Sequence, residues 1–382
     1  MNTPKIRFKG FKDDWEQRKL EDVAEFLDTM RKPLEGARRI PGPYPYYGAS
    51  GIVDYVDGYL FNEELVLLSE DGANITDRNY PVCFLASGKY WVNNHAHVLR
   101  LKDGNENNFV CTSLERKDYK QYNSGMAMPK LNQEVCRRIP IGCPSFNEQK
   151  KIGDYFRELD NLITLHQRKC DETKQLKKFM LQKMFPKNGE KNPEIRFEGF
   201  TDAWEQRKFE DVGTVAMCKR IFKEQTSEEG EVPFYKIGTF GGIPDAYITR
   251  ELFEEYKKNY QYPNKGDILI SASGSIGRTV EYTGKDEYYQ DSNIVWLKHE
   301  NDLDNSFLKV LYGVIEWSCE GSTIKRLYND NFLKTEFMLP KIEEQIKIGE
   351  YFSKLDHLIT LHQRKCEKLK ALKKFMLQNM FI

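Results

Sequence analysis

The sequence predicts an α+β fold built as a tandem repeat, in which two globular α/β parts are separated by two long antiparallel, coiled-coil-like helices. This prediction depends on two blocks of sequence that each occur twice. Residues 4–23 and 193–212 differ at five of twenty positions, and residues 147–185 and 343–381 match at 28 of 39 positions. The first block opens each half of the chain and the second closes it, which gives the fold a pseudo-twofold character.

Length and composition are those of a globular protein with two domains. The 382 residues exceed one typical core, and 40% of them are hydrophobic and 30% charged. No apolar run approaches the roughly eighteen residues of a membrane helix, and the N-terminus lacks the apolar core of a secretion signal. We therefore expect a cytoplasmic protein. Basic and acidic residues number 58 each, so net charge gives no argument for a nucleic-acid partner, and any such argument must come from local patches.

The closing blocks predict two long helices. They contain no proline, their only glycines are Gly153 and Gly349, and apolar residues recur at spacings of three and four. Such a helix is roughly 57 Å long, more than a compact domain covers, so each helix needs a second long helix as its partner. Two nearly identical faces can pack about a local twofold axis, which makes the pair antiparallel. The alternative is that each helix packs on its own domain.

The predicted seam between the helices has the octapeptide ITLHQRKC near its centre. His166 and His362 fall at the midpoints of the two closing blocks, so in a pair without stagger they would meet and fix the register. The alternative is that each imidazole turns to solvent. The predicted seam residues are Ile152, Phe156, Leu159, Ile163, His166 and Cys170 in the first helix and Ile348, Phe352, Leu355, Ile359, His362 and Cys366 in the second.

The stretches between the repeated blocks differ in sequence but keep the same order of features. Each has an apolar strand ending in a glycine turn, a later strand, and a glycine loop that ends in basic residues and leucine. The corresponding segments are 64–75 with 267–278, 90–102 with 288–300, and 124–131 with 320–327. The sequence therefore indicates one scaffold with two different surfaces.

No motif predicts a catalytic centre. The chain has no GxxxxGK[ST] phosphate loop, no NPPY- or DPPY-type loop and no GxSxG elbow. Asp245, Glu255 and Lys257 resemble a metal-nuclease pattern, but the segment reads as helix or loop. His95 and His97 share one face of a predicted strand, yet no third metal ligand has a persuasive spacing. The eight scattered cysteines form no CxxC pair and favour reduced thiols. We expect no metal in this chain.

Binding is better supported than catalysis. Basic clusters with aromatic or small polar neighbours recur in predicted loops of both halves, where lysine and arginine neutralise phosphates and Asn, Ser, Tyr and His meet base edges. The alternative for each cluster is a solvated charged face. The predicted DNA-contact residues are Arg38, Arg39, Tyr46, Tyr47, Ser50, Asn93, Asn94, His95, His97, Lys130, Lys219, Arg220, Ser273, Ser275, Arg278, Ser292, Asn293, Lys325 and Arg326.

Taken in order, these motifs resemble the specificity subunit of type I restriction–modification enzymes over essentially the whole chain. The resemblance is carried by IRF-x-GF and WEQRKLEDV in the opening block, by YYGASG, SEDGAN and NNHAHV in the first variable region, and by LITLHQRK and LKKFMLQ in the closing helices. No single motif is diagnostic, but their order and duplication are highly specific.

The resemblance implies a non-catalytic subunit that reads double-stranded DNA. Each variable region would be a target recognition domain for one half of a split sequence, and the helices would act as a ruler for the gap. Two adenine methyltransferase subunits with S-adenosylmethionine would dock on the repeated parts. Translocase and nuclease subunits, which use ATP and magnesium, would join through the methyltransferase core. This chain itself would carry no cofactor.

The expected domains follow the repeats. The rival reading is an interaction scaffold on a helical coiled coil that binds something other than DNA. The expected segments are a first target recognition domain (1–146), a first spacer helix (147–185), a linker (186–192), a second target recognition domain (193–342) and a second spacer helix (343–382).

Overall fold

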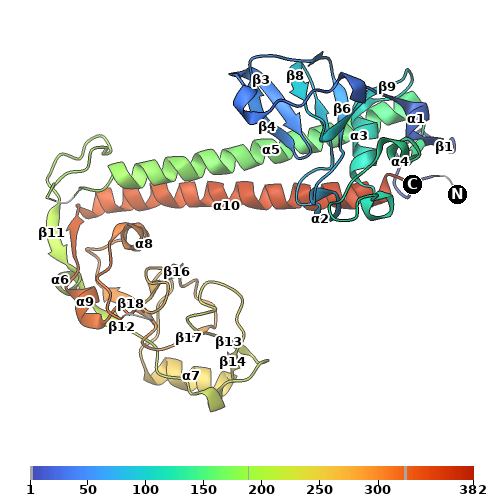
Figure 1. The fold of residues 1–382 in the computed structure, drawn as a ribbon. Coiled ribbons are helices and arrows are strands. Elements are labelled where there is room, and N and C mark those ends of the chain that lie inside the picture. Colours follow the sequence, from blue (N-terminus) through green and yellow to red (C-terminus); the bar gives the residue numbers. More distant parts are fainter. Residues whose placement is uncertain (1–2, 188, 322–324) are drawn as a thin grey trace. The chain divides into compact units, whose positions relative to one another are not determined.

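The computed structural model describes residues 3–187, 189–321 and 325–382 (Figure 1). Its contacts separate two compact units. Unit 1 runs from the N-terminal region to Arg168 and includes His362–Ile382, and unit 2 is Lys169–Leu361. Each unit thus holds one globular part together with portions of both long helices. This division cuts each helix near its middle, whereas the sequence repeats set each helix apart as a segment of its own.

Unit 1 contains two four-stranded sheets and a separate strand pair. The first sheet has the order β2-β9-β6-β7 and is antiparallel, and the second has the order β4-β3-β8-β5, in which β3 and β8 are parallel. The strands are β1 (Glu16–Lys19), β2 (Ala24–Phe26), β3 (Pro41–Gly48), β4 (Gly51–Val56), β5 (Phe61–Asn62), β6 (Leu65–Ser69), β7 (Cys83–Ala86), β8 (Lys89–Val92), β9 (Ala96–Leu101) and β10 (Pro140–Cys143). The helices are α1 (Leu20–Val23), α2 (Asn74–Asp77), α3 (Asn107–Glu115) and α4 (Gln133–Arg137), with short 3-10 turns at Asp28–Met30, Gly36–Arg38 and Tyr119–Tyr122.

Unit 2 repeats this plan with different residues. Its antiparallel sheet has the order β12-β18-β15-β16, which matches β2-β9-β6-β7, and a three-stranded sheet has the order β14-β13-β17. The strands are β11 (Glu205–Lys208), β12 (Gly213–Ala216), β13 (Val232–Tyr235), β14 (Tyr247–Ile248), β15 (Ile268–Ser271), β16 (Thr279–Glu281), β17 (Tyr288–Tyr289), β18 (Ile294–His299) and β19 (Glu336–Leu339). The helices are α6 (Phe209–Val212), α7 (Arg250–Asn259), α8 (Asn305–Val314) and α9 (Asn329–Leu333), with a 3-10 turn at Lys223–Gln225.

The opening and closing blocks hold each other in both units. Arg7 places Nε 2.6 Å from Glu148 Oε1, and Arg196 places Nε 2.7 Å from Glu344 Oε1. Both carboxylates are almost fully buried, so each needs its arginine. The strand pairs β1 with β10 and β11 with β19 join each opening block to the strand that precedes its closing block. The same arginine–glutamate pair therefore joins the opening and closing blocks of both units.

The two long helices are α5 (Phe146–Lys183) and α10 (Ile342–Asn379), each 38 residues long. They run side by side and antiparallel within each unit (Figure 1). In unit 1, Lys373 Nζ lies 2.6 Å from Asp160 Oδ1, and in unit 2 the repeat-equivalent Lys177 Nζ lies 2.5 Å from Asp356 Oδ1. The α+β tandem repeat predicted from the sequence is confirmed.

The predicted seam residues divide into two groups. Ile152, Phe156 and Leu159 are buried with Trp15 in the core of unit 1, where Met376 of α10 also packs. Toward the midpoint, Ile163 and Ile359 are half-buried, while Cys170 and Cys366 are buried. The equivalent core group in unit 2 is Ile348, Phe352, Leu355 and Trp204. The outer part of each predicted seam thus packs in a globular core as well as in the helix pair. Both arrangements considered from the sequence, a pair of long helices and a helix packed on its own domain, are therefore present.

At the midpoint, His166 Nδ1 lies 3.0 Å from His362 Nδ1, within unit 1. One ring donates and the other accepts, as the register hypothesis requires of a polar pair in a seam.

All eight cysteines are unpaired, and seven of them are buried. Within the described residues, no helix combines the length and apolar character needed to cross a membrane.

Candidate functional site

Three loops meet at one end of the first sheet of unit 1. They are residues 70–73 after β6, residues 93–95 before β9, and residues 123–131 before α4. Main-chain hydrogen bonds join them: Leu131 N donates to Glu70 O (2.7 Å), Gly72 N to Pro129 O (3.0 Å) and Glu70 N to His95 O (2.9 Å). We call these segments the three-loop cluster of unit 1.

Unit 2 builds the same cluster from unrelated residues. Leu327 N donates to Ala272 O (2.9 Å), Gly274 N to Lys325 O (3.1 Å) and Ala272 N to Asn293 O (2.8 Å). Each bond is the counterpart of one in unit 1, although among the bonded residues only one leucine and one glycine are the same in both clusters. Because backbone hydrogen bonds do not depend on the identity of the side chains, this frame can carry different side chains in each unit.

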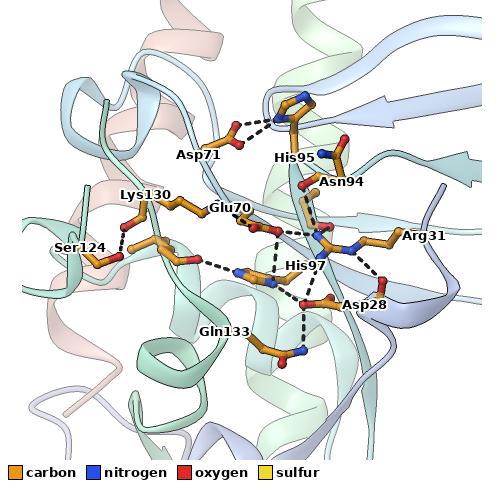
Figure 2. A network of polar contacts seen from close by, with 12 residues as sticks. Asp28, Arg31, Glu70, Asp71, Asn94, His95, His97, Ser124, Lys130 and Gln133 are labelled. Carbon is orange, nitrogen blue, oxygen red and sulfur yellow. Dashed lines mark hydrogen bonds and ion pairs between the residues drawn. The ribbon is translucent and has the colours of Figure 1, made fainter. Parts of the chain in front are cut away.

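A buried ionic network supports the cluster of unit 1 (Figure 2). His97, which is 1% exposed, places Nδ1 2.6 Å from Asp28 Oδ2 and Nε2 2.8 Å from the Leu131 carbonyl. Arg31 lies 2.6 Å from Glu70 and 3.3 Å from Asp28. These contacts tie all three loops to the turn that follows β2.

Charge is balanced within this network. Burial would lower the pKa of His97, but its hydrogen bond to Asp28, with further contributions from Cys136, raises the pKa to about 10. Burial would raise the pKa of Asp28, but His97 and Arg31 hold it below its usual value. His97 is therefore an imidazolium paired with a carboxylate at neutral pH.

Three residues of the same network lie close enough together to be considered as metal ligands. Ligand atoms of Asp28, Glu70 and His97 lie within 4.8 Å of one another. However, Arg31 already contacts both carboxylates, and Lys130 Nζ lies 3.3 Å from Glu70 Oε1. A metal ion would have to bind beside two cationic side chains and displace the proton on His97, so the donor set does not fit a metal.

In the described part of unit 2, apolar residues stand at the positions of His97, Asp28 and Glu70. In unit 1, Leu68 is the strand partner of His97, and in unit 2 the equivalent Ile270 is the partner of Val295. The strand registers of β2 and β12 likewise show that Met217 of unit 2 corresponds to Asp28 of unit 1. The main-chain hydrogen bonds of the loops show that Ala272 corresponds to Glu70. An apolar support therefore replaces a charged one beneath the same loop frame.

Exposed polar side chains lie on the outer side of the unit 1 cluster. His95 Nδ1 is 2.9 Å from both carboxylate oxygens of Asp71, and Asn94 and Lys130 are also exposed. Asn123 Oδ1 accepts hydrogen bonds from Gly125 N and Lys130 N, both at 2.9 Å, which braces the third loop. That loop presents two exposed methionines, Met126 and Met128.

Two predicted DNA contacts in unit 1 are wrong because their side chains are buried. His97 lies on β9, where Ala96 to Leu99 are all buried, so both faces of the strand are covered. Tyr46 is 1% exposed, and its hydroxyl accepts a hydrogen bond from Leu34 N. Asn93 is also mostly buried, and its Oδ1 accepts from His95 N. Asn93 therefore positions the loop.

The other predicted contacts of unit 1 are spread out. Ser50 is exposed at the β3–β4 turn, whose Ala49 carbonyl accepts from Ser69 Oγ beside the cluster, and Tyr47 packs against the core. Arg38 lies 3.6 Å from Glu35, and Arg39 lies 3.2 Å from Asp54 and over Tyr46. No contact among the described residues brings these two arginines to the cluster.

In unit 2 most predicted contacts converge on the cluster. Arg220 Nε lies 2.8 Å from Asp291 Oδ2, and Ser292 adopts a positive φ of 54° in the same turn as Asn293. Such a backbone conformation is uncommon for serine and indicates a turn held by its surroundings. Ser273 is buried and forms an isolated bridge with Arg326. The exposed members of the predicted set are Lys219, Arg220, Ser275, Arg278, Ser292, Lys325 and Arg326, with Asn293 half-buried.

Sequence reasoning missed Asp28, Arg31 and Glu70 as parts of the network and Asp71 as the partner of His95. The acidic pair after the apolar run in SEDG and the nearby NNHAH segment carried the signal, but their pairing depends on tertiary structure.

The nuclease-like residues do not form a site. Asp245 pairs with Lys236 at 2.9 Å, while Lys257 on α7 pairs with Asp286 at 3.5 Å. Among the described residues, neither Asp245 nor Glu255 belongs to a group of potential metal ligands.

Comparison with known proteins defines the class of this chain. The type I restriction modification DNA specificity domain matches it twice, at residues 12–175 and 201–371. A type I restriction enzyme specificity subunit of Haemophilus influenzae is 41% identical over 352 residues, which are 92% of this chain and 89% of that protein. One of Methanocaldococcus jannaschii is 24% identical over 399 residues, covering 95% and 91%.

The fold agrees with this class. The crystal structure of a type I restriction–modification system S subunit from M. genitalium has a TM-score of 0.71 at 14% identity, covering 100% of this chain and 99% of that chain. The chain belongs to the type I restriction–modification DNA specificity family and is a DNA sequence-recognition subunit.

Proposed function

We propose that unit 1 and unit 2 each read one half-site of a bipartite DNA target through their three-loop clusters. The observation that carries this proposal is the repeated backbone frame with different side chains. A protein that reads two unrelated half-sites can use the same backbone scaffold twice, with a different set of side chains on each copy. Three matched main-chain hydrogen bonds in each unit support such an arrangement. The target recognition domains then correspond to residues 1–146 and 193–342, with the two closing helices as spacers.

The repeats also support two docking sites for one partner. Leu176 and Phe179 of unit 2 are 44% and 48% exposed, and the repeat-equivalent Leu372 and Phe375 of unit 1 are 40% and 53% exposed. We call each pair an LKKF patch. Residues three apart on a helix share a face, so each pair forms one apolar spot. Core packing does not explain why the exposed leucine and phenylalanine are identical in both helices. The binding of two copies of the same partner does explain it, because each copy needs the same apolar contact.

The partner is then a methyltransferase subunit, present twice and carrying S-adenosylmethionine. Translocase and nuclease subunits, with ATP and magnesium, join through it. This chain contributes no catalytic group and no cofactor to either reaction. The complex works in the cytoplasm, where the DNA that it modifies lies.

The test is to co-express the chain with its methyltransferase partner and map methylated adenines across the genome. We expect one motif with two defined halves and a fixed unspecified gap. Scattered or ungapped methylation would contradict the proposal. Duplex binding that stays weak and insensitive to salt, even with partners present, would favour the scaffold reading instead.

Magnesium-dependent cleavage by the isolated chain, abolished by Glu255→Ala, would revive the nuclease reading. The distances around Asp245 and Lys257 give that reading no support.

A further inference from the structure

We propose that His95, held by Asp71, reads an exocyclic amino group of adenine or cytosine in the half-site bound by unit 1. Asp71 is a positioning residue, and His95 is the specificity-determining residue. The inference rests on the proposed function, because it requires that unit 1 binds DNA through its three-loop cluster.

His95 is fixed at both its backbone and its ring. His95 N donates to Asn93 Oδ1 at 2.8 Å, and its carbonyl accepts from Glu70 N at 2.9 Å. Both oxygens of Asp71 lie 2.9 Å from Nδ1. The side chain is nevertheless 49% exposed, and Figure 2 shows the ring at the outer edge of the network. A preorganised but accessible side chain loses little entropy when it binds a base.

The Asp71 contact determines which atom His95 offers. The carboxylate accepts the hydrogen on Nδ1, so in the neutral imidazole Nε2 carries the lone pair. Nε2 makes no hydrogen bond with any residue in the described part of the chain. In the major groove, the donors available to such an acceptor are N6 of adenine and N4 of cytosine.

Unit 2 has different side chains at the same two places. Ser273 occupies the position of Asp71, and Asn293 that of His95, because the flanking main-chain bonds correspond. Isolated bridges also correspond, from Asp71 to Lys130 and from Ser273 to Arg326. Both members of the pair therefore change together while the frame stays. A hydrogen bond between two partly exposed side chains adds only modest stability, so a purely structural role gives weak reason for this arrangement.

The experiment uses the full chain in complex with its methyltransferase partner and duplexes that carry the mapped motif. One amino group at a time is removed from the half-site, with purine in place of adenine and 2-pyrimidinone in place of cytosine. We expect one such deletion to weaken wild-type binding about tenfold. His95→Ala should weaken binding to intact DNA by a similar factor and be indifferent to that deletion.

Asp71→Ala should cause part of the same loss in DNA binding. Combined with His95→Ala, it should cause no further loss. Asn293→Ala in unit 2 is the matched control and should leave the coupling between His95 and the amino group intact. If His95→Ala does not assemble, His95→Gln replaces it, since its side-chain carbonyl can still accept and should keep part of the coupling.

If the loss of binding from His95→Ala and the loss from each amino deletion simply add when the two changes are combined, for every amino group, the inference is overturned. Coupling to 7-deazaguanine, which lacks the N7 acceptor, would also overturn it, because His95 would then donate a hydrogen bond. A wild-type complex without a gapped motif would instead contradict the proposed function. The two failures are therefore distinguishable.

Discussion

The buried charges of unit 1 illustrate how a few single residues support the three-loop cluster. His97 and Asp28 are both nearly inaccessible and satisfy one another, with Arg31 completing the balance. Unit 2 replaces His97 and Asp28 with Val295 and Met217. Replacing a whole buried ion pair by apolar groups is often neutral, whereas removing one partner leaves an uncompensated charge.

We therefore expect His97→Val to destabilise unit 1 by about 3 kcal/mol, since Asp28 loses its nearest partner. The double variant Asp28→Met, His97→Val should recover most of this loss because it recreates the support of unit 2. Urea unfolding of the full chain measures both. A double variant that is less stable than His97→Val would show that the network has no apolar equivalent.

The residue scale is also where sequence prediction was weakest. Asp28, Glu70 and His97 are far apart in the chain and have no repeat in the second half, so neither spacing nor duplication marks them. His97 was predicted to contact DNA because histidine can meet base edges, but β9 is buried on both sides. Tyr46 failed for the same reason, since an aromatic residue near a basic cluster can equally belong to the core.

At the level of elements, the long helices were predictable almost to their ends. Their ranges begin at Phe146 and Ile342, within one residue of the predicted starts, because the repeated apolar spacing and the absence of proline leave little alternative. What the spacing could not separate was the part of each apolar stripe that enters a globular core. Ile152 and Phe156 have the same periodicity as the midpoint residues but different neighbours.

The His166–His362 pair is expected to fix the register of α5 and α10. Replacing both histidines with leucine should raise stability, because a polar pair in an apolar seam is unfavourable, and should also loosen the register. The readout is the gap length in the methylation motif, measured beside thermal unfolding. An unchanged gap preference would end the register hypothesis, whatever happens to stability.

For the whole molecule, the tandem repeat explains why the blocks match and the middles differ. The repeated blocks carry the Arg7–Glu148 and Arg196–Glu344 pairs and the LKKF patches, while the variable stretches carry the loops. This division was visible in the sequence because duplication gives an internal comparison. The individual loop contacts were not visible, because the loop residues differ between the two halves and so have no internal comparison.

The LKKF patches give a prediction about assembly. Changing Leu372 and Phe375 to serine should remove one methyltransferase copy, and changing Leu176 and Phe179 as well should remove both, with little loss of stability because these side chains are exposed. Native mass spectrometry of the purified complex counts the copies.

Ile346→Ser is the matched control for assembly, since Ile346 is 41% exposed but its repeat position is Lys150. Full assembly of both LKKF variants would place the docking surface elsewhere. Loss of assembly in the Ile346 variant would show that the effect is not specific to the repeated patches.

The central claim is that each unit reads its own half-site. The most direct measurement compares the methylation map of the wild-type complex with those of Lys325→Ala and Arg326→Ala, both in the unit 2 cluster. The account predicts weaker methylation through one half of the motif, with the other half, the gap and the assembled complex unchanged. Changes in both halves, or loss of the complex, would contradict it.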